Sequence, residues 1–248
     1  MRIDVAFTPD DVKHLEPSGV CVVVDVLRAS STITTALFNG CLGIYPVSEP
    51  SEAFPFADGM RVLACGERNG VKIRGYHLGN SPAEFGKQAV GGKELVMCTT
   101  NGTAAIRVGA ARGRALIGCF LNAPAVMSIL EKQSDDVTII CAGREGDFSI
   151  EDALCAGMIV SRLEGQRTDT AVASAAIFRE HGARVEEVLF QSQHGRFLQQ
   201  TGFAGDVGYC ARVGVMSVLP EVFASGKPAP HDLVIRAVAG AESLREGK

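Results

Sequence analysis

The sequence lacks long hydrophobic runs. Nowhere among its 248 residues do about 18 apolar residues follow one another, and the first segment, MRIDVAFTPDD, has no long apolar stretch after its basic residue. A bilayer-crossing helix needs about 20 such residues, and a secretory signal needs an apolar segment behind a basic start. We therefore expect neither a signal peptide nor a membrane span, and we predict a cytoplasmic protein.

Excess positive charge is also missing. The chain contains 24 lysines and arginines against 28 aspartates and glutamates, so its formal net charge is -4. General affinity for nucleic acid depends on clustered basic residues that meet phosphates. The composition therefore argues against a nucleic-acid partner and favours a small ligand.

The eight cysteines lack the spacing of a zinc site, because no CxxC pair occurs. Most of them lie in or beside apolar runs, and 46% of the residues are hydrophobic, which is ample material for a buried core. We expect the cysteines to be reduced core residues.

Several motifs of phosphate and hydrolase chemistry are absent as well. The chain has no G-x-x-x-x-G-K-[ST] loop, no usable G-x-G-x-x-G, no H-E-x-x-H and no G-x-S-x-G. No cysteine is followed six residues later by arginine, and no aspartate is followed two residues later by another. Common nucleotide hydrolysis, phosphocysteine and phosphoaspartate mechanisms are therefore disfavoured.

Short β-branched runs alternate with segments of helical period, which indicates a mainly parallel sheet flanked by helices. Candidate strands occupy residues 3–7, 20–26, 43–47, 61–67, 94–100, 114–121 and 137–143, and candidate helices begin near Ser30, Ser81, Gly102, Asn122 and Ser149. Residues 169–214 read as helix after helix, and a last strand follows at 215–222. Without a repeat or a clear linker, we predict one domain over 1–248, with a helical portion at about 150–214 packed on the same sheet.

The first candidate site lies at the end of a hydrophobic strand that is followed by polar residues. The segment VCVVVDVLRASST closes its apolar run with Asp25, places Arg28 in the turn, and offers Ser30 and Ser31 at the start of the next helix. Strand ends and helix N-termini form the binding crevice of α/β sheets, because free backbone N–H groups there favour anions. The alternative is structural: a serine that only caps the helix and a hydrogen-bonded carboxylate.

Three further predicted strands end in the same way. They deliver Glu67, Arg68 and Asn69; Thr99, Thr100, Asn101 and Thr103 around Gly102; and Arg144, Glu145 and Asp147 followed by Glu151 and Asp152. Glu151 or Asp152 could instead serve only the dipole of the helix that they begin. Carboxylates beside arginines repel or neutralise one another unless a hard cation and an anionic substrate lie between them. The mixture therefore favours phosphate chemistry with Mg²⁺.

These segments carry a family resemblance. VVVDVLRASSTITTAL, CGERNG, GYHLGNSPAEF, TTNGTAA and CAGREGDFSIEDALCAG together resemble the 2-phosphosulfolactate phosphatase family (ComB-like proteins). The resemblance implies a three-layer α/β/α fold with a mixed, mainly parallel sheet and a helix-rich C-terminal third. It also implies a Mg²⁺-dependent phosphoric monoester hydrolase that converts (2R)-phospho-3-sulfolactate to 3-sulfolactate and phosphate, a step toward coenzyme M.

The residues and the resemblance together suggest roles. Asp25 is either a metal ligand or the group that orients the attacking water, while Arg28 and Arg144 hold the anionic groups. Glu67 and one or more of Glu145, Glu151 and Asp152 complete the magnesium shell. Candidate phosphate-binding residues are Ser30, Ser31, Asn80, Ser81, Thr100, Asn101, Gly102 and Thr103.

Among the five histidines, His77 alone lies in a suspected site segment, at a position where the family often has an acidic residue. If that acid is a metal ligand in the family, His77 either weakens the Mg²⁺ interpretation or shifts ligation to Asp25, Glu67, Glu145 or Asp152. Two other functions stay open: a non-catalytic sensor or carrier of a phosphorylated metabolite, and a phosphatase of a different small phospho-acid. A homodimer is also possible.

Overall fold

The computed structural model describes residues 1–14 and 19–238. Its strands are β1 (Arg2–Ala6), β2 (Val20–Val24), β3 (Gly43–Pro46), β4 (Val62–Arg68), β5 (Val71–Lys72), β6 (Glu94–Cys98), β7 (Arg114–Gly118), β8 (Val137–Cys141), β9 (Gln166–Arg167), β10 (Leu219–Ala224) and β11 (Leu233–Val238). Its α-helices are α1 (Ala29–Phe38), α2 (Lys87–Val90), α3 (Gly102–Ala110), α4 (Ala123–Leu130), α5 (Ile150–Arg162), α6 (Asp169–His181), α7 (Val185–Gln191), α8 (Gln193–Gln200) and α9 (Ala204–Cys210).

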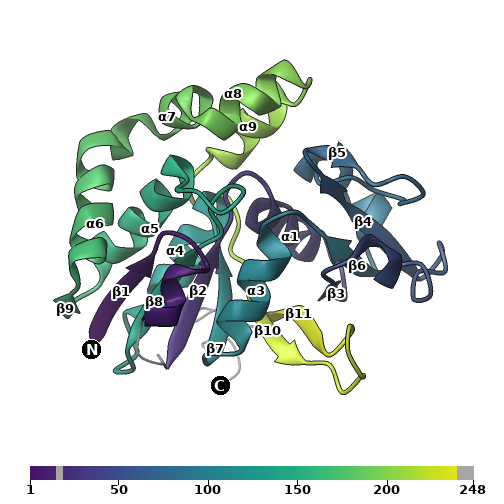
Figure 1. Cartoon of the computed structure of the whole chain (residues 1–248), viewed down its shortest axis with the longest axis horizontal. Helices are drawn as coiled ribbons and strands as arrows, with labels where there is room; N and C mark the ends of the chain where they lie inside the picture. Colours follow the sequence, from purple (N-terminus) through teal and green to yellow (C-terminus); the bar gives the residue numbers. More distant parts are fainter. Residues whose placement is uncertain (15–18, 239–248) are drawn as a thin grey trace, which may run out of the picture.

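Within these residues, the strands form one 11-stranded sheet in the order β5-β4-β6-β3-β11-β10-β7-β2-β8-β1-β9 (Figure 1). Two parallel sets, β4-β6-β3 and β7-β2-β8-β1-β9, are joined through the antiparallel hairpin β10–β11. The predicted α/β class with a mixed, mainly parallel sheet is therefore confirmed.

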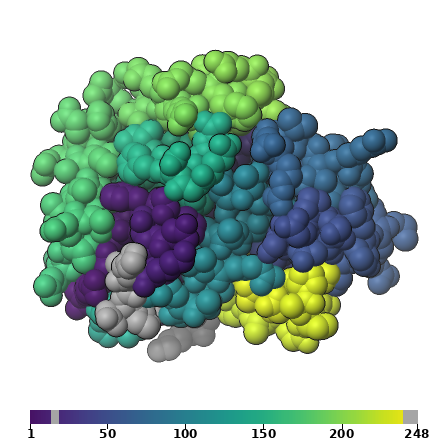
Figure 2. Space-filling view, viewed as in Figure 1, coloured from purple at the N-terminus to yellow at the C-terminus, as the bar shows by residue number. Residues whose placement is uncertain are grey.

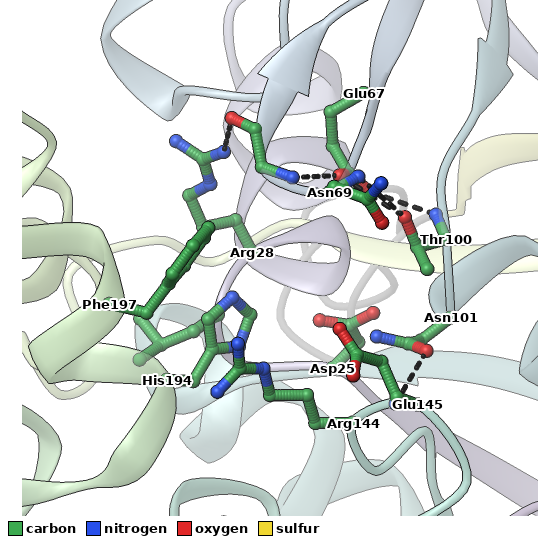
Figure 3. Close-up of a pocket in the computed structure, with 12 residues that line it drawn as sticks. Asp25, Arg28, Glu67, Asn69, Thr100, Asn101, Arg144, Glu145, His194 and Phe197 are labelled. Atoms are coloured by element: carbon green, nitrogen blue, oxygen red, sulfur yellow. Dashed lines mark hydrogen bonds between the residues drawn. The ribbon is translucent and has the colours of Figure 1, made fainter. Parts of the chain in front are cut away.

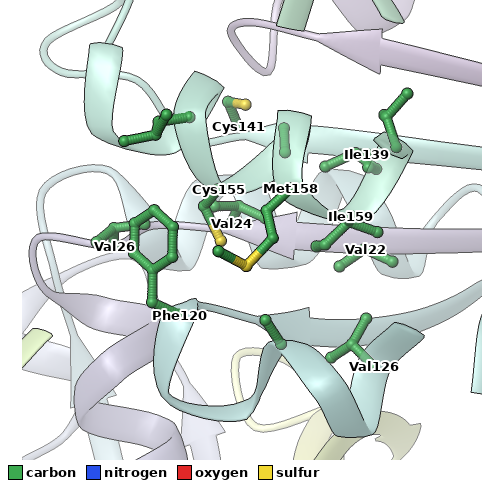
Figure 4. Packing of buried hydrophobic residues seen from close by; sticks show 14 of the residues in the cluster. Val22, Val24, Val26, Phe120, Val126, Ile139, Cys141, Cys155, Met158 and Ile159 are labelled. Carbon is green, nitrogen blue, oxygen red and sulfur yellow. The ribbon is translucent and has the colours of Figure 1, made fainter. Parts of the chain in front are cut away.

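Helices cover both faces of the sheet around β2. Val22 and Val24 pack under α4 and α5, where they meet Val126 and Ile159 (Figure 4). The intervening Val23 faces α3, which comes so close that a Cβ at Gly109 would lie 2.8 Å from Val23 Cγ2. A strand buried on both faces needs an unbroken apolar run, which explains why the sequence there reads VCVVV.

The helical portion after α5 packs mainly on α5 and only partly on the sheet. Helix α6 lies against α5 and reaches β1, α7 packs on α5, and α8 and α9 pack on α7 and on each other (Figure 1). Buried Leu189, Leu198 and Val207 join these helices to the core beneath. In the space-filling view this segment runs along one border of the molecule and meets the residues around β4 and β5 (Figure 2).

Two local expectations need correction. The helix predicted near Ser81 is a 3-10 turn at Pro82–Glu84 followed by the short α2, because Pro82 starts a turn that Gly86 ends in an extended conformation. Strand β11 was not predicted, although its antiparallel pairing with β10 joins the two parallel sets of the sheet. All eight cysteines lie in described ranges, buried and without disulfides. Among the described residues, no helix has the length and hydrophobicity to cross a bilayer.

The close crossing of α5 and α6 generates a stability prediction. A Cβ at Gly157 would lie 2.0 Å from the Ser174 carbonyl oxygen. Gly157→Ala should therefore separate the helices and lower the free energy of unfolding by about 2 to 4 kcal/mol, measured by urea denaturation.

Gly205→Ala is the matched control, because Gly205 is also helical and has no neighbouring atom within 4 Å of the added Cβ. It should keep or slightly raise the stability, since alanine favours helix over glycine. Equal losses in the two variants would contradict the close-packing argument.

Candidate active site

A cavity of about 90 Å³ lies where strand ends from both parallel sets meet helix α8 (Figure 3). It is lined by Asp25, Leu27, Arg28, Glu67, Asn69, Gly70, Thr100, Asn101, Arg144, Glu145, His194 and Phe197. Four of the polar segments identified in the sequence, after β2, β4, β6 and β8, therefore contribute to one pocket.

Asp25 lies at the bottom of this pocket, directly after β2, and is only 7% exposed. Its Oδ1 accepts a hydrogen bond from the Ala29 backbone N–H (3.2 Å), at the start of α1. Gly102, the first residue of α3, faces the other oxygen, since a Cβ there would lie 2.7 Å from Oδ2. Two helix N-termini thus face one carboxylate, an arrangement that favours negative charge.

The pKa of Asp25 is nevertheless raised to about 7. Burial is the main cause, the Ala29 N–H acts in the opposite direction, and the nearby Glu67 and Glu151 carboxylates raise the pKa further. Arg28 lowers the pKa only slightly in comparison, so the side chain exchanges a proton near neutral pH.

Glu67 ties two loops of the pocket together. One oxygen accepts the Gly70 backbone N–H (2.7 Å) and the other accepts the Thr100 backbone N–H (2.8 Å). The Thr100 hydroxyl donates as well, at 3.2 Å. Because a carboxylate offers about four lone-pair sites, Glu67 keeps capacity for a further ligand while it positions the β4–β5 turn against the end of β6.

The loop after β8 brings Arg144 and Glu145 to the opposite wall. The Glu145 backbone N–H donates to Asn101 Oδ1 (3.1 Å). Glu145 (φ 54) and Asn69 (φ 52) are the positive-φ residues other than glycine in the described part of the chain, and both line this pocket. Such backbone conformations are unfavourable for glutamate, so local strain is concentrated here.

The two arginines are held differently. Arg28 is buried and pairs with Asp206 of α9 (2.7 Å), while its guanidinium lies over the Phe203 ring (4.4 Å). Within the described residues, the Arg144 guanidinium makes no ion pair and lies over the Phe197 ring (5.0 Å). Arg144 therefore carries the less compensated positive charge.

Glu151 and Asp152, both candidate magnesium ligands, lie behind the pocket and do not line it. Asp152 accepts backbone N–H bonds from Val26 (2.8 Å) and Gly143 (3.2 Å), which tie the loop after β2 to the loop after β8. Burial raises the pKa of both carboxyls. The bonds of Asp152 indicate a structural role, and ligation by either residue stays a prediction.

Most of the predicted phosphate-binding hydroxyls bond to the backbone. Ser30 Oγ accepts the Asp25 N–H (2.9 Å), and the Ser31 and Thr103 hydroxyls donate to main-chain carbonyls. Ser81 donates to Asp206 (2.6 Å).

Of the eight candidate phosphate-binding residues, Thr100 and Asn101 line the cavity. Gly102 does not line the cavity but lies close to the Asp25 carboxylate. Asn80 is buried outside the lining, and its side-chain oxygen has no partner among the described residues. Phosphate binding by residues outside the lining stays a prediction.

The histidine in the pocket is His194 and not His77. His77 accepts the Ala64 N–H through Nδ1 (3.0 Å) and lies outside the lining. Burial, Arg144 and Arg28 lower the pKa of His194 to about 3, so this side chain is neutral. Sequence reasoning missed His194, Phe197 and Asp206 because no motif marks them. A cap at Ser192 before an amphipathic helix was the available signal.

The donor set suits Mg²⁺ if substrate and water complete the shell. Asp25, Glu67 and Glu145 supply carboxylates, and the amides of Asn69 and Asn101 supply further oxygens. No three His, Cys, Asp or Glu side chains of the described residues are close enough to hold an ion by themselves. Mg²⁺ commonly uses one or two carboxylates together with waters and phosphate oxygens.

The model of the family described as 2-phosphosulpholactate phosphatase matches residues 6–224. A "Probable 2-phosphosulfolactate phosphatase" of Pseudothermotoga lettingae is 42% identical over 219 residues, which cover 88% of this chain and 94% of the relative. One of Carboxydothermus hydrogenoformans is 41% identical over 226 residues, 89% of this chain and 93% of the relative. The chain therefore belongs to the 2-phosphosulpholactate phosphatase family of phosphoric monoester hydrolases.

Proposed function

We propose that this protein is a Mg²⁺-dependent, cytoplasmic phosphatase that hydrolyses (2R)-phospho-3-sulfolactate to 3-sulfolactate and phosphate, as in coenzyme M biosynthesis. The supporting observation is that three carboxylates and two arginines line one small cavity. A substrate with a phosphate and a second acid group matches the arginines, and a cation balances the carboxylates.

Glu67 and Glu145 are the residues that would hold the ion together with water and phosphate oxygens, and the ion would supply charge neutralisation at the phosphate. Arg144 and Arg28 bind the anionic oxygens, and Thr100 and Asn101 line the wall where the transferred group lies. Asp25 serves either as a further ligand or as the group that orients the attacking water and accepts its proton. In the second role, its pKa of about 7 suits a general base at neutral pH.

The alternative function, a sensor or carrier, explains the arginines but not the acids. Three carboxylates in a cavity of about 90 Å³ repel an anion unless a cation is bound. This favours an enzyme over a binding protein. Hydrolysis of a different small phospho-acid is the remaining alternative, and a homodimer stays a prediction.

The first test of the site is metal removal. Activity should disappear in excess chelator and return with Mg²⁺, whereas Zn²⁺ should support it poorly because the lining offers oxygen ligands and a single histidine. Released phosphate is the measurement. Full turnover in chelator would rule out the metal mechanism.

The second test is Asp25→Asn, which keeps the shape and removes the charge. Loss of either a metal ligand or the group that orients the attacking water should lower kcat by roughly 10³-fold or more. A folded variant that keeps more than about a tenth of the wild-type kcat would overturn the assignment.

Stability in chelator provides the internal control for this variant. The folded-state pKa of Asp25 (about 7) exceeds its ordinary value of 3.8, so the folded chain binds more protons between these pH values and loses stability as the pH rises. Asp25→Asn removes this cost. It should match the wild type at pH 4 and exceed its unfolding free energy at pH 8 by about 2 to 4 kcal/mol.

Arg144→Ala tests the second anion site. The wild type should show a much higher kcat/KM for a sulfonated or carboxylated phosphate ester than for a neutral aryl phosphate. In the variant, the difference in transition-state binding between the two esters should fall by about 2 to 4 kcal/mol. This is the effect expected when the arginine that pairs with the acid group of the substrate is removed. Equal efficiency of the wild type toward both esters would mean that the second anion site does not exist.

A further inference from the structure

The two pocket arginines differ in what fixes their position. Arg28 is held by the Asp206 carboxylate (2.7 Å), the Gly70 carbonyl (3.3 Å) and the Phe203 ring. Within the described residues, the Arg144 side chain makes no hydrogen bond or ion pair, and its central carbon lies 5.0 Å from the centroid of the Phe197 ring. The position of Arg144 therefore depends on the Phe197 ring, whereas Arg28 is fixed by several groups.

The Phe197 ring is itself seated between two loops. On one side it contacts the β4–β5 turn, because a Cβ at Gly70 would lie 2.6 Å from Phe197 Cε1. On the other side it faces Arg144 of the loop after β8 (Figure 3). Helix α8 supports the ring, since buried Leu198 anchors it and Ser192 caps its first turn (2.9 Å to the Gly195 N–H).

A ring in this position prepares the guanidinium for an anion. Arginine has many rotamers, and binding is weakened by the entropy lost when a free side chain is fixed. Stacking on an aromatic face fixes the guanidinium plane and leaves its N–H edges free to donate to oxygens. Carboxylates in the same pocket, such as Glu145, would otherwise compete for an unrestrained Arg144.

We propose that Phe197 is a positioning residue that fixes Arg144 over the pocket, so that helix α8 determines the preference for substrates with a second anionic group. This inference rests on the proposed function, because it requires Arg144 to bind an acid group of the substrate. It assigns a specificity role to a residue far in sequence from every strand-end motif.

The test compares 2-phospholactate, which carries a second acid group, with para-nitrophenyl phosphate, which does not. Phe197→Leu should reduce the ratio of their kcat/KM values by about 3- to 30-fold, the range expected for a cation–π contact. The loss should lie mainly in KM for 2-phospholactate. Phe197→Tyr keeps the ring face and should retain the ratio within about 2-fold.

Gly70→Ala provides a second route to the same effect. The added methyl group collides with the ring at a backbone φ of +76°, so the ratio should fall as in Phe197→Leu. Gly226→Ala is the matched control, because Gly226 has the same φ of +76° and no atom within 4 Å of the added Cβ. In the Phe197→Leu background, Gly70→Ala should reduce the ratio little further.

The outcomes separate this inference from the proposed function. If the wild type hydrolyses neither ester and does not hydrolyse (2R)-phospho-3-sulfolactate either, the proposed function fails. If Arg144→Ala abolishes the preference while Phe197→Leu, with an unchanged melting temperature, keeps it, only the positioning role fails. Independent effects of Phe197→Leu and Gly70→Ala in the double variant would also contradict it, because a shared ring contact requires them to be coupled.

Discussion

The burial of negative charge at the end of β2 is the constraint on which the site depends. Asp25 ends an apolar strand, and the buried carboxyls of Glu151 and Asp152 lie near enough to influence it or one another. Desolvation makes such a cluster costly unless hydrogen-bond donors or cations compensate. The chain supplies donors from helix N-termini and loop backbones, and these bonds hold the loops after β2 and β8 together.

The C-terminal helices supply the part of the pocket that the sheet does not provide. Helix α9 provides Asp206, which compensates the buried Arg28 and accepts a hydrogen bond from Ser81. Helix α8 provides His194 and Phe197 to the wall above Asp25. A buried guanidinium without its partner would be strongly destabilising, so the sheet edge and the helical portion depend on each other electrostatically as well as through the hydrophobic core.

Sequence patterns located the strand ends well, because an apolar run that stops at polar residues marks the point where a buried strand leaves the core. Segments around Asp25, Glu67, Thr100 and Arg144 all reach one pocket. Side-chain roles within these segments were harder to assign. Hydroxyl groups can bind a ligand, but those of Ser30, Ser31 and Thr103 form hydrogen bonds with nearby backbone groups. Asp152 accepts a backbone hydrogen bond outside the pocket.

The sequence by itself determined the alternation of strands and helices, the buried β2 and the family, since these depend on local periodicity and ordered motifs. Only the tertiary structure decided that the β10–β11 hairpin separates the two parallel sets and that α8 lies above Asp25. Those placements depend on contacts between residues more than 100 positions apart, such as Arg28 with Asp206. The local sequence does not reveal such partners. An aspartate or phenylalanine on a helix has the same sequence pattern around it whichever distant residue it contacts in the folded protein.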